Sequence, residues 1–465
     1  MLMLTSIANG NESRISLWRR VREFAVPPSM IETASARRAA GDWGGACAAA
    51  GFDVDIDLRA LARSHGRELA VRVRADLRTL APDLLRWHMP RIAPDGLLRP
   101  GLTVTLARYS TEGHGTSCCR AGSVHLVART APAWADAGQR ISIALWGESL
   151  SGNGAALHPH TRPDRRFRLD LHRHLWDTGR SDELRMRSGA EQFDESVVMD
   201  PGLPELAPQG CAIDRWAAEA EILLRGDGLP AGPLLVRLGA RGRVVVEPHS
   251  HGDDPPVLRI VRKYPRGSAS ALPVLPDAAT WALPDLELLR AGAISADRLH
   301  PLVASALVPG HKPSETPCST HRSGHPHLVE CRGEQHRIGL LDGVLTALDH
   351  HPAEVRREEL LVALTGTPLP CLQAIDQAHR HPDCLTGVRE RLRHGDIAGA
   401  LAVVEGLLGP GAQLREGALR DELEAAAQQR ITYGLFRSGL FASGSTREQR
   451  PRPPHRTHPR HAVLH

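Results

Sequence analysis

The sequence predicts an α+β fold in which an antiparallel, β-rich centre is flanked by N-terminal and C-terminal helical blocks. Three observations predict it. Apolar residues recur at helical spacing before residue 100 and after residue 353. Between residues 102 and 262 the pattern changes to short apolar or alternating runs typical of strands. Loop-rich gaps separate these runs, as in an antiparallel meander.

Length and composition indicate more than one core. With 465 residues and 42% hydrophobic content the chain can form two or three ordinary cores. The predicted segments, in order, are a poorly ordered leader (1–26), a helical block (27–100), a β-rich α+β domain (101–308), a His/Pro/Ser linker (309–326), a small β-hairpin with a helical block (327–440) and a disordered basic tail (441–465).

In the N-terminal block, helices are predicted at 29–40, from Asp42 onward, at 58–64 and at 66–86. Pro27-Pro28 precede the first helix, and Pro90, Pro94 and Pro100 close the block. Because the residues near Gly51 interrupt the second helix, that helix is short.

The centre is predicted to contain seven strands and four helices. The strands lie at 103–109, 124–129, 141–146, 166–172, 234–238, 243–247 and 257–262, and the helices at 175–187, 213–225, 285–291 and 296–307.

After the linker, three strands are predicted at 328–332, 336–341 and 344–348, with Asp342-Gly343 as a tight turn. The helices that follow are predicted at 353–365, 371–379, 385–393, 397–408 and 419–437.

One short phrase occurs twice, as Arg37-Arg-Ala-Ala-Gly-Asp42-Trp-Gly-Gly-Ala and as Arg391-Leu-Arg-His-Gly-Asp396-Ile-Ala-Gly-Ala. The Gly can end one helix in a left-handed conformation, and the Asp can cap the next. The second copy, with its trailing Pro410, resembles the second helix of a tetratricopeptide repeat, and the first copy resembles it less well. Since such repeats need about three neighbours to bury a core, we expect two isolated helical hairpins and no superhelix.

The chain as a whole resembles the uncharacterised conserved proteins of Streptomyces-type actinobacteria. The resemblance lies in Val21-Arg-Glu-Phe-Ala-Val-Pro-Pro and in Ile431-Thr-Tyr-Gly-Leu-Phe-Arg. It implies a bacterial source and no activity.

Charge argues against a nucleic-acid or membrane surface on the body of the protein. The tail from Arg447 onward holds five Arg and one Glu, a net of +4, which equals the charge of the whole chain. The rest is therefore neutral and has no field to steer it onto a polyanion. Only His interleaves with the tail's Arg, so the tail lacks a stacking platform and would bind nucleic acid non-specifically.

Eight Cys without any Cys-x-x-Cys pair are too few for a disulfide scaffold, so we expect a reducing cytoplasm. The sequence has no signal-like start and no apolar run long enough to span a membrane.

The first candidate metal site is Asp170-Leu-His172-Arg-His174. On a strand these three alternate residues share a face, and two His with a carboxylate suit zinc or ferrous iron. The alternative is that Phe167, Leu169 and Leu171 face the core while the polar residues face water.

The second candidate metal site combines Cys318, His321, Cys331 and His336, which could hold zinc tetrahedrally. The alternative is that they bind no metal, because the spacing fits no standard knuckle and the first two lie in the linker.

No residue is predicted to be catalytic or to bind an organic cofactor. Gly147-Glu-Ser149-Leu-Ser-Gly152 lacks the spacing of a nucleophile elbow, and no Walker-type phosphate loop occurs. We therefore expect a non-catalytic interaction or adaptor protein with an unknown protein partner. The alternatives are a metal-dependent enzyme that uses the Asp-x-His-x-His segment and a nucleic-acid-associated regulator that uses the Arg-rich tail.

Overall fold

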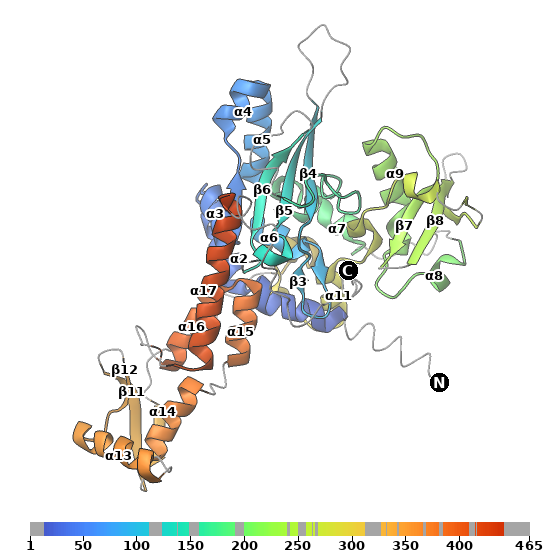
Figure 1. Ribbon diagram of the computed structural model, residues 1–465. Coiled ribbons are helices and arrows are strands. Elements are labelled where there is room, and N and C mark those ends of the chain that lie inside the picture. Colours follow the sequence, from blue (N-terminus) through green and yellow to red (C-terminus); the bar gives the residue numbers. More distant parts are fainter. Residues whose placement is uncertain are drawn as a thin grey trace. The chain divides into compact units, whose positions relative to one another are not determined.

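The computed structural model describes residues 14–110, 123–136, 138–147, 158–190, 200–239, 242–249, 257–262, 264–265, 268–311, 327–331, 333–341, 344–365, 369–380, 385–408, 414 and 416–440. Helices account for 51% and strands for 20%, with antiparallel sheets and helices toward both ends, so the predicted α+β class is confirmed (Figure 1). Most of the predicted linker and the predicted tail lie outside the described residues. Within these ranges no helix is long and apolar enough to cross a membrane.

The chain forms two compact units. Unit 1 comprises residues 1–313 together with 435–465, and unit 2 comprises residues 314–434. Each unit is described by itself.

The main sheet of unit 1 has the strand order β1-β6-β5-β4. The strands β4 (Thr103–Ser110), β5 (Ser123–Thr130) and β6 (Ile141–Trp146) form an antiparallel meander and lie side by side in Figure 1. The strand β1 (Phe52–Asp55) joins β6 in parallel and was not predicted. Gly51, at a φ of 76°, turns the chain out of the preceding helix and into this strand.

Several helical segments precede β4 and follow the helical residues 14–20. They are η1, a π-helix (Val21–Ala25), α2 (Pro28–Ala39), α3 (Trp43–Ala49), α4 (Leu58–His65), α5 (Arg67–Thr79) and α6 (Pro82–His88), and the short pair β2 (Arg91–Ile92) and β3 (Leu97–Leu98) follows them. The helix predicted at 66–86 is thus broken at Pro82, which has no N–H and disfavours helix before it. Leu80 forms a bridge with Asp177 instead.

The predicted leader is wrong for residues 14–26. Residues 14–20 are α-helical and run into η1. Arg22 lies 3.8 Å above the ring of Trp87, and both donate hydrogen bonds to the fully buried Asp285, at 3.0 and 2.7 Å. This buried charge pair ties three distant parts of the chain together.

The helical block and the β-rich centre form one core. Apolar side chains of α5 and α6 belong to the same cluster of buried residues as those of β4, β5 and β6, among them Val73, Leu84, Val104, Leu126 and Ile143. The boundary predicted near residue 100 therefore does not separate two folding units.

The predicted strand at 166–172 is wrong. Its only strand-like contact is a single bridge between Arg168 and Thr105, after which the chain turns. Short helical pieces follow, η4 (Arg173–Leu175), η5 (Thr178–Arg180) and α7 (Glu183–Ser188). Backbone hydrogen bonds to β4 are sparse here and do not form a strand ladder. The N–H of Asp164, just before the segment, donates to the carbonyl of Thr103, and the N–H of Asp170 donates to that of Thr105.

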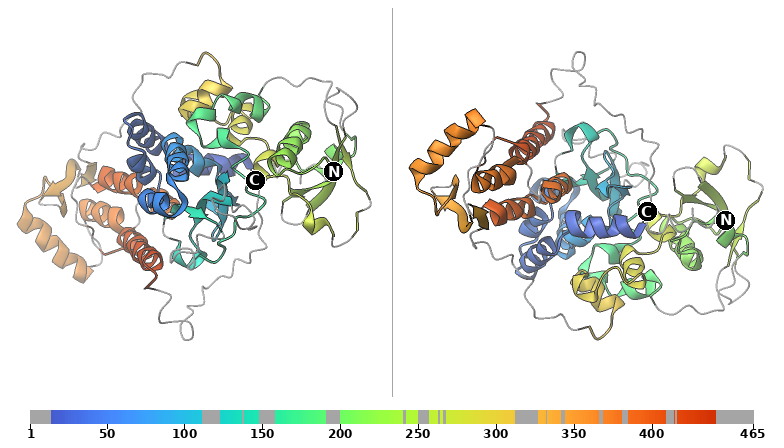
Figure 2. Two further views of the ribbon diagram at one scale, coloured as in Figure 1. Left: turned by 90° about the horizontal axis from the view of Figure 1, so that it is seen from above. Right: turned by 90° about the horizontal axis from the view of Figure 1, so that it is seen from below.

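A second, smaller core of unit 1 forms around the sheet β7 (Leu234–Leu238), β8 (Gly242–His249) and β9 (Val257–Ile260), as Figure 2 shows. The helices α8 (Leu203–Leu206), α9 (Trp216–Gly226) and α10 (Asp277–Thr280) accompany it. The helices α11 (Pro284–Arg290) and α12 (Pro301–Leu307) then contribute to the main core.

Unit 2 begins with the three-stranded antiparallel sheet β10 (His327–Cys331), β11 (Glu334–Leu341) and β12 (Val344–Ala347). The helices α13 (Pro352–Thr365), α14 (Pro370–Arg380), α15 (Leu385–His394), α16 (Ile397–Leu408) and α17 (Ala418–Arg437) follow. All three strands and all five helices were predicted from the sequence within a few residues.

The repeated phrase forms a helical hairpin in each unit, α2–α3 in unit 1 and α15–α16 in unit 2. Gly41 and Gly395 both have positive φ, and Asp42 and Asp396 accept hydrogen bonds from the third residue of the next helix at 2.8 and 2.9 Å. That third residue is Gly in both copies, and a Cβ there would require the capping carboxylate to shift.

The two caps differ in exposure, which allows a matched test. The Asp42 side chain is 50% exposed and that of Asp396 only 6%. We expect Asp396→Ala to lower the free energy of unfolding of unit 2 by about 1–2 kcal/mol, since a buried cap is lost. Asp42→Ala should have a smaller effect, because water can replace the exposed carboxylate. Hydrogen exchange of α3 and α16 measures both, and equal losses would contradict this account.

Candidate metal centre

One face of the β10–β12 sheet carries the ligands of a candidate metal site. Cys331 pairs with Glu334 and Val329 pairs with His336, so Cys331 and His336 lie on the same face. Ile338 and Ala347 continue that face and are buried. Sequence alternation alone places these residues toward the core.

A salt bridge brings a second histidine beside the first. Asp349 accepts hydrogen bonds from the backbone N–H and the guanidinium of Arg337, at 2.6 and 2.7 Å, and this pairing holds the pKa of Asp349 at about 2. Asp349 directly precedes His350, and Arg337 directly follows His336. The pair Arg337–Asp349 therefore places the two imidazoles beside each other. Their rings are T-shaped, and Nδ1 of His336 lies 2.7 Å from Nε2 of His350.

The fourth ligand comes from the start of α14. Pro370 is the first residue of this helix and Cys371 the second, and Cys371 and Ile375 are buried one turn apart on the same side. The Cys371 Sγ lies 3.9 Å from Nδ1 of His336.

Together, Cys331, His336, His350 and Cys371 place one ligand atom each within 4.8 Å of one another. Two thiols and two imidazoles form the Cys2His2 set of structural zinc sites. The edges of a zinc tetrahedron measure about 3.3–3.8 Å, so the two imidazole nitrogens would separate slightly on binding. Burial, and next the nearby Cys331, raise the pKa of the Cys371 thiol to about 11.

The outer nitrogen of each histidine faces a carboxylate. Nε2 of His336 lies 3.7 Å from Glu334, and Nδ1 of His350 lies 3.6 Å from Glu354. Both separations exceed hydrogen-bond distance, and the Glu334 side chain is 84% exposed, so these carboxylates do not fix the orientation of the imidazoles.

Two of these four residues, Cys331 and His336, belong to the second candidate set predicted from the sequence, whose other members, Cys318 and His321, lie outside the described residues. His350 and Cys371 were missed. His350 follows β12 by three residues, and α13 separates Cys371 from the sheet. The available signals were a histidine two residues after a predicted strand and a cysteine at a predicted helix start.

The other predicted set, Asp170, His172 and His174, is held by other partners. Asp170 accepts two hydrogen bonds from Arg168, at 2.8 and 2.9 Å. His172 contacts the carbonyl of Arg168 through Nδ1 and Glu219 through Nε2, at 3.0 and 3.1 Å. In the part of the chain that the structure describes, these three do not form a metal-ligand group. The alternative that the polar residues face water also fails, because both histidines are buried.

Glu219, on α9, is the centre of this buried network. Arg187 donates two hydrogen bonds to it, at 2.8 and 2.7 Å, and Arg215 one, at 3.2 Å. Burial by itself would raise the pKa of Glu219, but His172 and Arg187 outweigh it and hold the pKa well below its usual range. Burial also lowers the pKa of His174 far below normal. The polar residues of this segment thus have a structural role in the fold.

Comparison of the chain with protein-family models, with curated proteins and with solved structures finds no match.

The network predicts how unit 1 responds to acid. Because the pKa of Glu219 is lower in the folded than in the unfolded chain, its stabilisation is present above about pH 4.3 and is lost as the pH falls further. We expect Glu219→Gln to cost about 3–5 kcal/mol at pH 7, since it leaves buried cations unpaired, and to flatten the acid-side loss. Denaturant unfolding followed by tryptophan fluorescence measures both.

Glu221→Gln is the matched control on the same helix. Glu221 is 41% exposed and pairs with Arg225 at 3.9 Å, so its replacement should change stability by less than about 1 kcal/mol. Similar effects of the two variants would contradict the role given to Glu219.

Proposed function

We propose that this chain is a non-catalytic protein-interaction protein and that residues 314–434 are its interaction unit. One zinc ion on Cys331, His336, His350 and Cys371 keeps that unit folded. The convergence of four ligand atoms within 4.8 Å is the observation that supports this proposal most.

The ligand set favours a structural role for the metal. Four protein ligands fill a tetrahedral shell and leave no position for water or substrate, which catalytic zinc requires. Thiolates disfavour magnesium and calcium, and an S2N2 set suits zinc. No carboxylate belongs to the four, so the facial arrangement of non-haem iron oxygenases does not apply.

Energetics indicate how much a metal would add to unit 2. Among the described side chains of its sheet, Ile338 and Ala347 are buried in the core, and a fully buried large apolar side chain contributes about 1.5–3 kcal/mol. Zinc binding contributes about 10–16 kcal/mol to the folding of zinc-finger peptides. A bound zinc ion would therefore stabilise the sheet and α14 by more than any single one of these side chains.

Exposed aliphatic side chains support the interaction role. Leu328, Leu360, Leu401 and Ile431 are 58%, 67%, 44% and 56% exposed, and they lie on β10, α13, α16 and α17 of unit 2. Stacked helical repeats use such surfaces for binding, so the assignment of α15–α16 to a partner rests on fold-level analogy.

We expect the purified chain to carry one zinc per molecule and to lose it with a strong chelator. Chelation should remove helical circular-dichroism signal, because unit 2 unfolds without metal. Tryptophan emission should change little, since all eight Trp lie between residues 18 and 281 of unit 1 and Trp134, whose ring contacts Phe436 on α17, is already exposed. Metal analysis with the two spectra tests this.

Cys371→Ser should reproduce the chelated state, whereas Cys211→Ser should keep its zinc. Cys211 is the matched control, a free, partly buried thiol of unit 1. Metal-free protein with a Cys331–Cys371 disulfide, detected by mass spectrometry, would overturn the proposed site.

The interaction role is tested by affinity capture from native lysate. A specific partner should be retained by the wild type and lost with Leu401→Asp and with Cys371→Ser. Leu229→Asp is the control, because Leu229 in unit 1 is as exposed as Leu401, at 43% against 44%. Failure to recover a protein above background, or retention by all variants alike, would contradict this function.

A further inference from the structure

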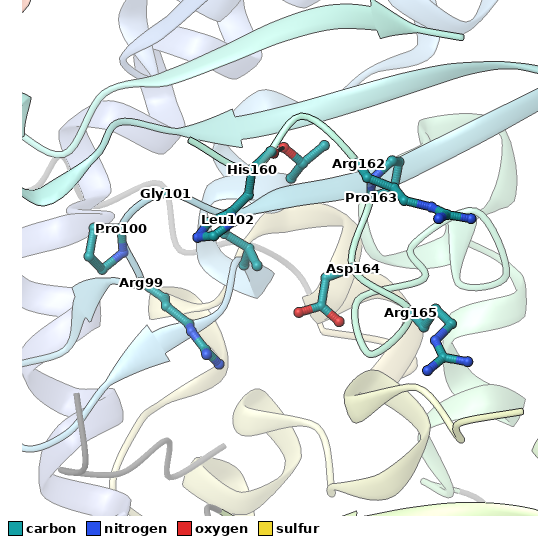
Figure 3. A pocket seen from close by; sticks show the side chains of 10 residues that line it. Arg99, Pro100, Gly101, Leu102, His160, Arg162, Pro163, Asp164 and Arg165 are labelled. Atoms are coloured by element: carbon teal, nitrogen blue, oxygen red, sulfur yellow. Dashed lines mark hydrogen bonds between the residues drawn. The ribbon is translucent and has the colours of Figure 1, made fainter. Parts of the chain in front are cut away.

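Unit 1 contains a cavity of about 620 Å³. Its lining residues, between residues 99 and 165, are distant in sequence from those of the candidate metal site. Its walls are the residues that lead into β4, from Arg99 to Thr103, and the segment from His160 to Arg165 that follows β6 (Figure 3). Sites for small organic ligands typically measure about 300–1,000 Å³. The cavity therefore has the size of a metabolite site and exceeds the needs of a single inorganic ion.

Hydrogen bonds hold both walls in place. The N–H of Asp164 donates to the carbonyl of Thr103 at 3.0 Å, and the Thr103 hydroxyl donates to the carbonyl of His160 at 2.5 Å. Thr130 Oγ1 donates to the carbonyl of Arg99 at 2.6 Å, and Nε2 of His158 lies 3.0 Å from the carbonyl of Thr130. A cavity braced in this way needs little ordering when a ligand binds.

The lining is basic. Arg99, Arg162 and Arg165 face one acidic residue, Asp164, which gives the lining a net charge of +2. Arg166 adds nothing to this, because Asp277 accepts two hydrogen bonds from it, at 3.1 and 2.6 Å. Among the described residues that line the cavity, positive charge therefore exceeds negative charge by two.

Two guanidinium groups near the cavity have buried nitrogens that lack a hydrogen-bond partner among the described residues. They are Nη1 of Arg99 and Nε of Arg237, on β7. Burial, and then the neighbouring Arg166, lower the pKa of both side chains. Unpaired buried donors and charges are costly unless a partner of opposite charge compensates them.

We propose that this cavity binds a small hydroxylated phosphate ester, with Arg99 on one wall and Arg162 on the other (Figure 3) supplying the positive charge that attracts the phosphate group. Arginine matches phosphate geometry with two parallel donors. Asp164 favours a ligand with hydroxyl groups, because a purely anionic ligand would be repelled by its carboxylate. Its Oδ1 accepts from the N–H of Arg166 at 2.9 Å, and in Figure 3 the carboxylate lies between Arg99 and Arg165. Oδ2 is then the acceptor for a ligand hydroxyl.

Calorimetric titration of the full chain tests this site with four probes, ribose 5-phosphate, ribose, inorganic phosphate and succinate. We expect one ribose 5-phosphate per chain, bound at least tenfold more tightly than the other three. Raising the salt concentration should weaken binding, since the contact is ionic. Equal binding of succinate or inorganic phosphate would overturn the assignment to a phosphate ester, and so would no binding of ribose 5-phosphate at millimolar concentration.

Point variants test whether ribose 5-phosphate binds in the cavity or on the Arg-rich tail, because every variant keeps the tail. Arg99→Gln and Arg162→Gln should each weaken ribose 5-phosphate at least tenfold. Arg162 is exposed, so its replacement leaves the fold intact even if Arg99→Gln destabilises it. Arg225→Gln, at a side chain 79% exposed on α9, removes the same charge elsewhere and should leave affinity unchanged. Binding that survives the two cavity variants, or that Arg225→Gln weakens as much, would overturn the site.

Discussion

We propose that the fold of unit 2 depends on four side chains that meet where the β10–β12 sheet contacts α14. The strands are short, and among the described side chains their inward face holds Val329, Ile338 and Ala347 besides the candidate ligands Cys331 and His336. A zinc ion on two thiolates and two imidazoles would join β10, β11, the turn after β12 and α14 at one point and add to this apolar burial. The hairpin α15–α16 packs on the same core. The proposed interaction surface would thus rest on the metal.

Unit 1 is stabilised by apolar burial and by arginine side chains that pair with carboxylates. Of the 57 basic residues of the chain all but Lys263 and Lys312 are arginines, and many of those described are buried beside a carboxylate, as Arg22 is by Asp285 and Arg187 by Glu219. The planar guanidinium suits such pairs because it can satisfy both carboxylate oxygens. Against this background the cavity at Arg99 is unusual, since its positive charge has no equal acidic partner. That difference is why we assign a ligand to the cavity and none to the Glu219 network.

Much of the fold follows from local patterns. The Gly-Asp phrase predicted two capped hairpins, and the positive φ of Gly41 and Gly395 with the caps of Asp42 and Asp396 shows why. Strand β1 was missed because four residues after a short helix carry no clear period. The segment 166–172 was wrongly predicted to be a strand. Its polar and apolar residues alternate because the polar ones form buried ion pairs, and neither side of the segment faces solvent. Two residues of the candidate metal site, Cys331 and His336, were singled out from the sequence. His350 and Cys371 were not, because the Arg337–Asp349 pair and the packing of α14 bring them beside the sheet.

X-ray absorption spectroscopy at the zinc edge tests the central claim most directly, because it reports the ligand atoms themselves. For the purified full chain, the account predicts a four-coordinate shell of two sulfurs at about 2.3 Å and two nitrogens at about 2.0–2.1 Å. A shell of oxygen and nitrogen alone, or one with a single sulfur, would show that Cys331 and Cys371 do not share a metal and would contradict the account.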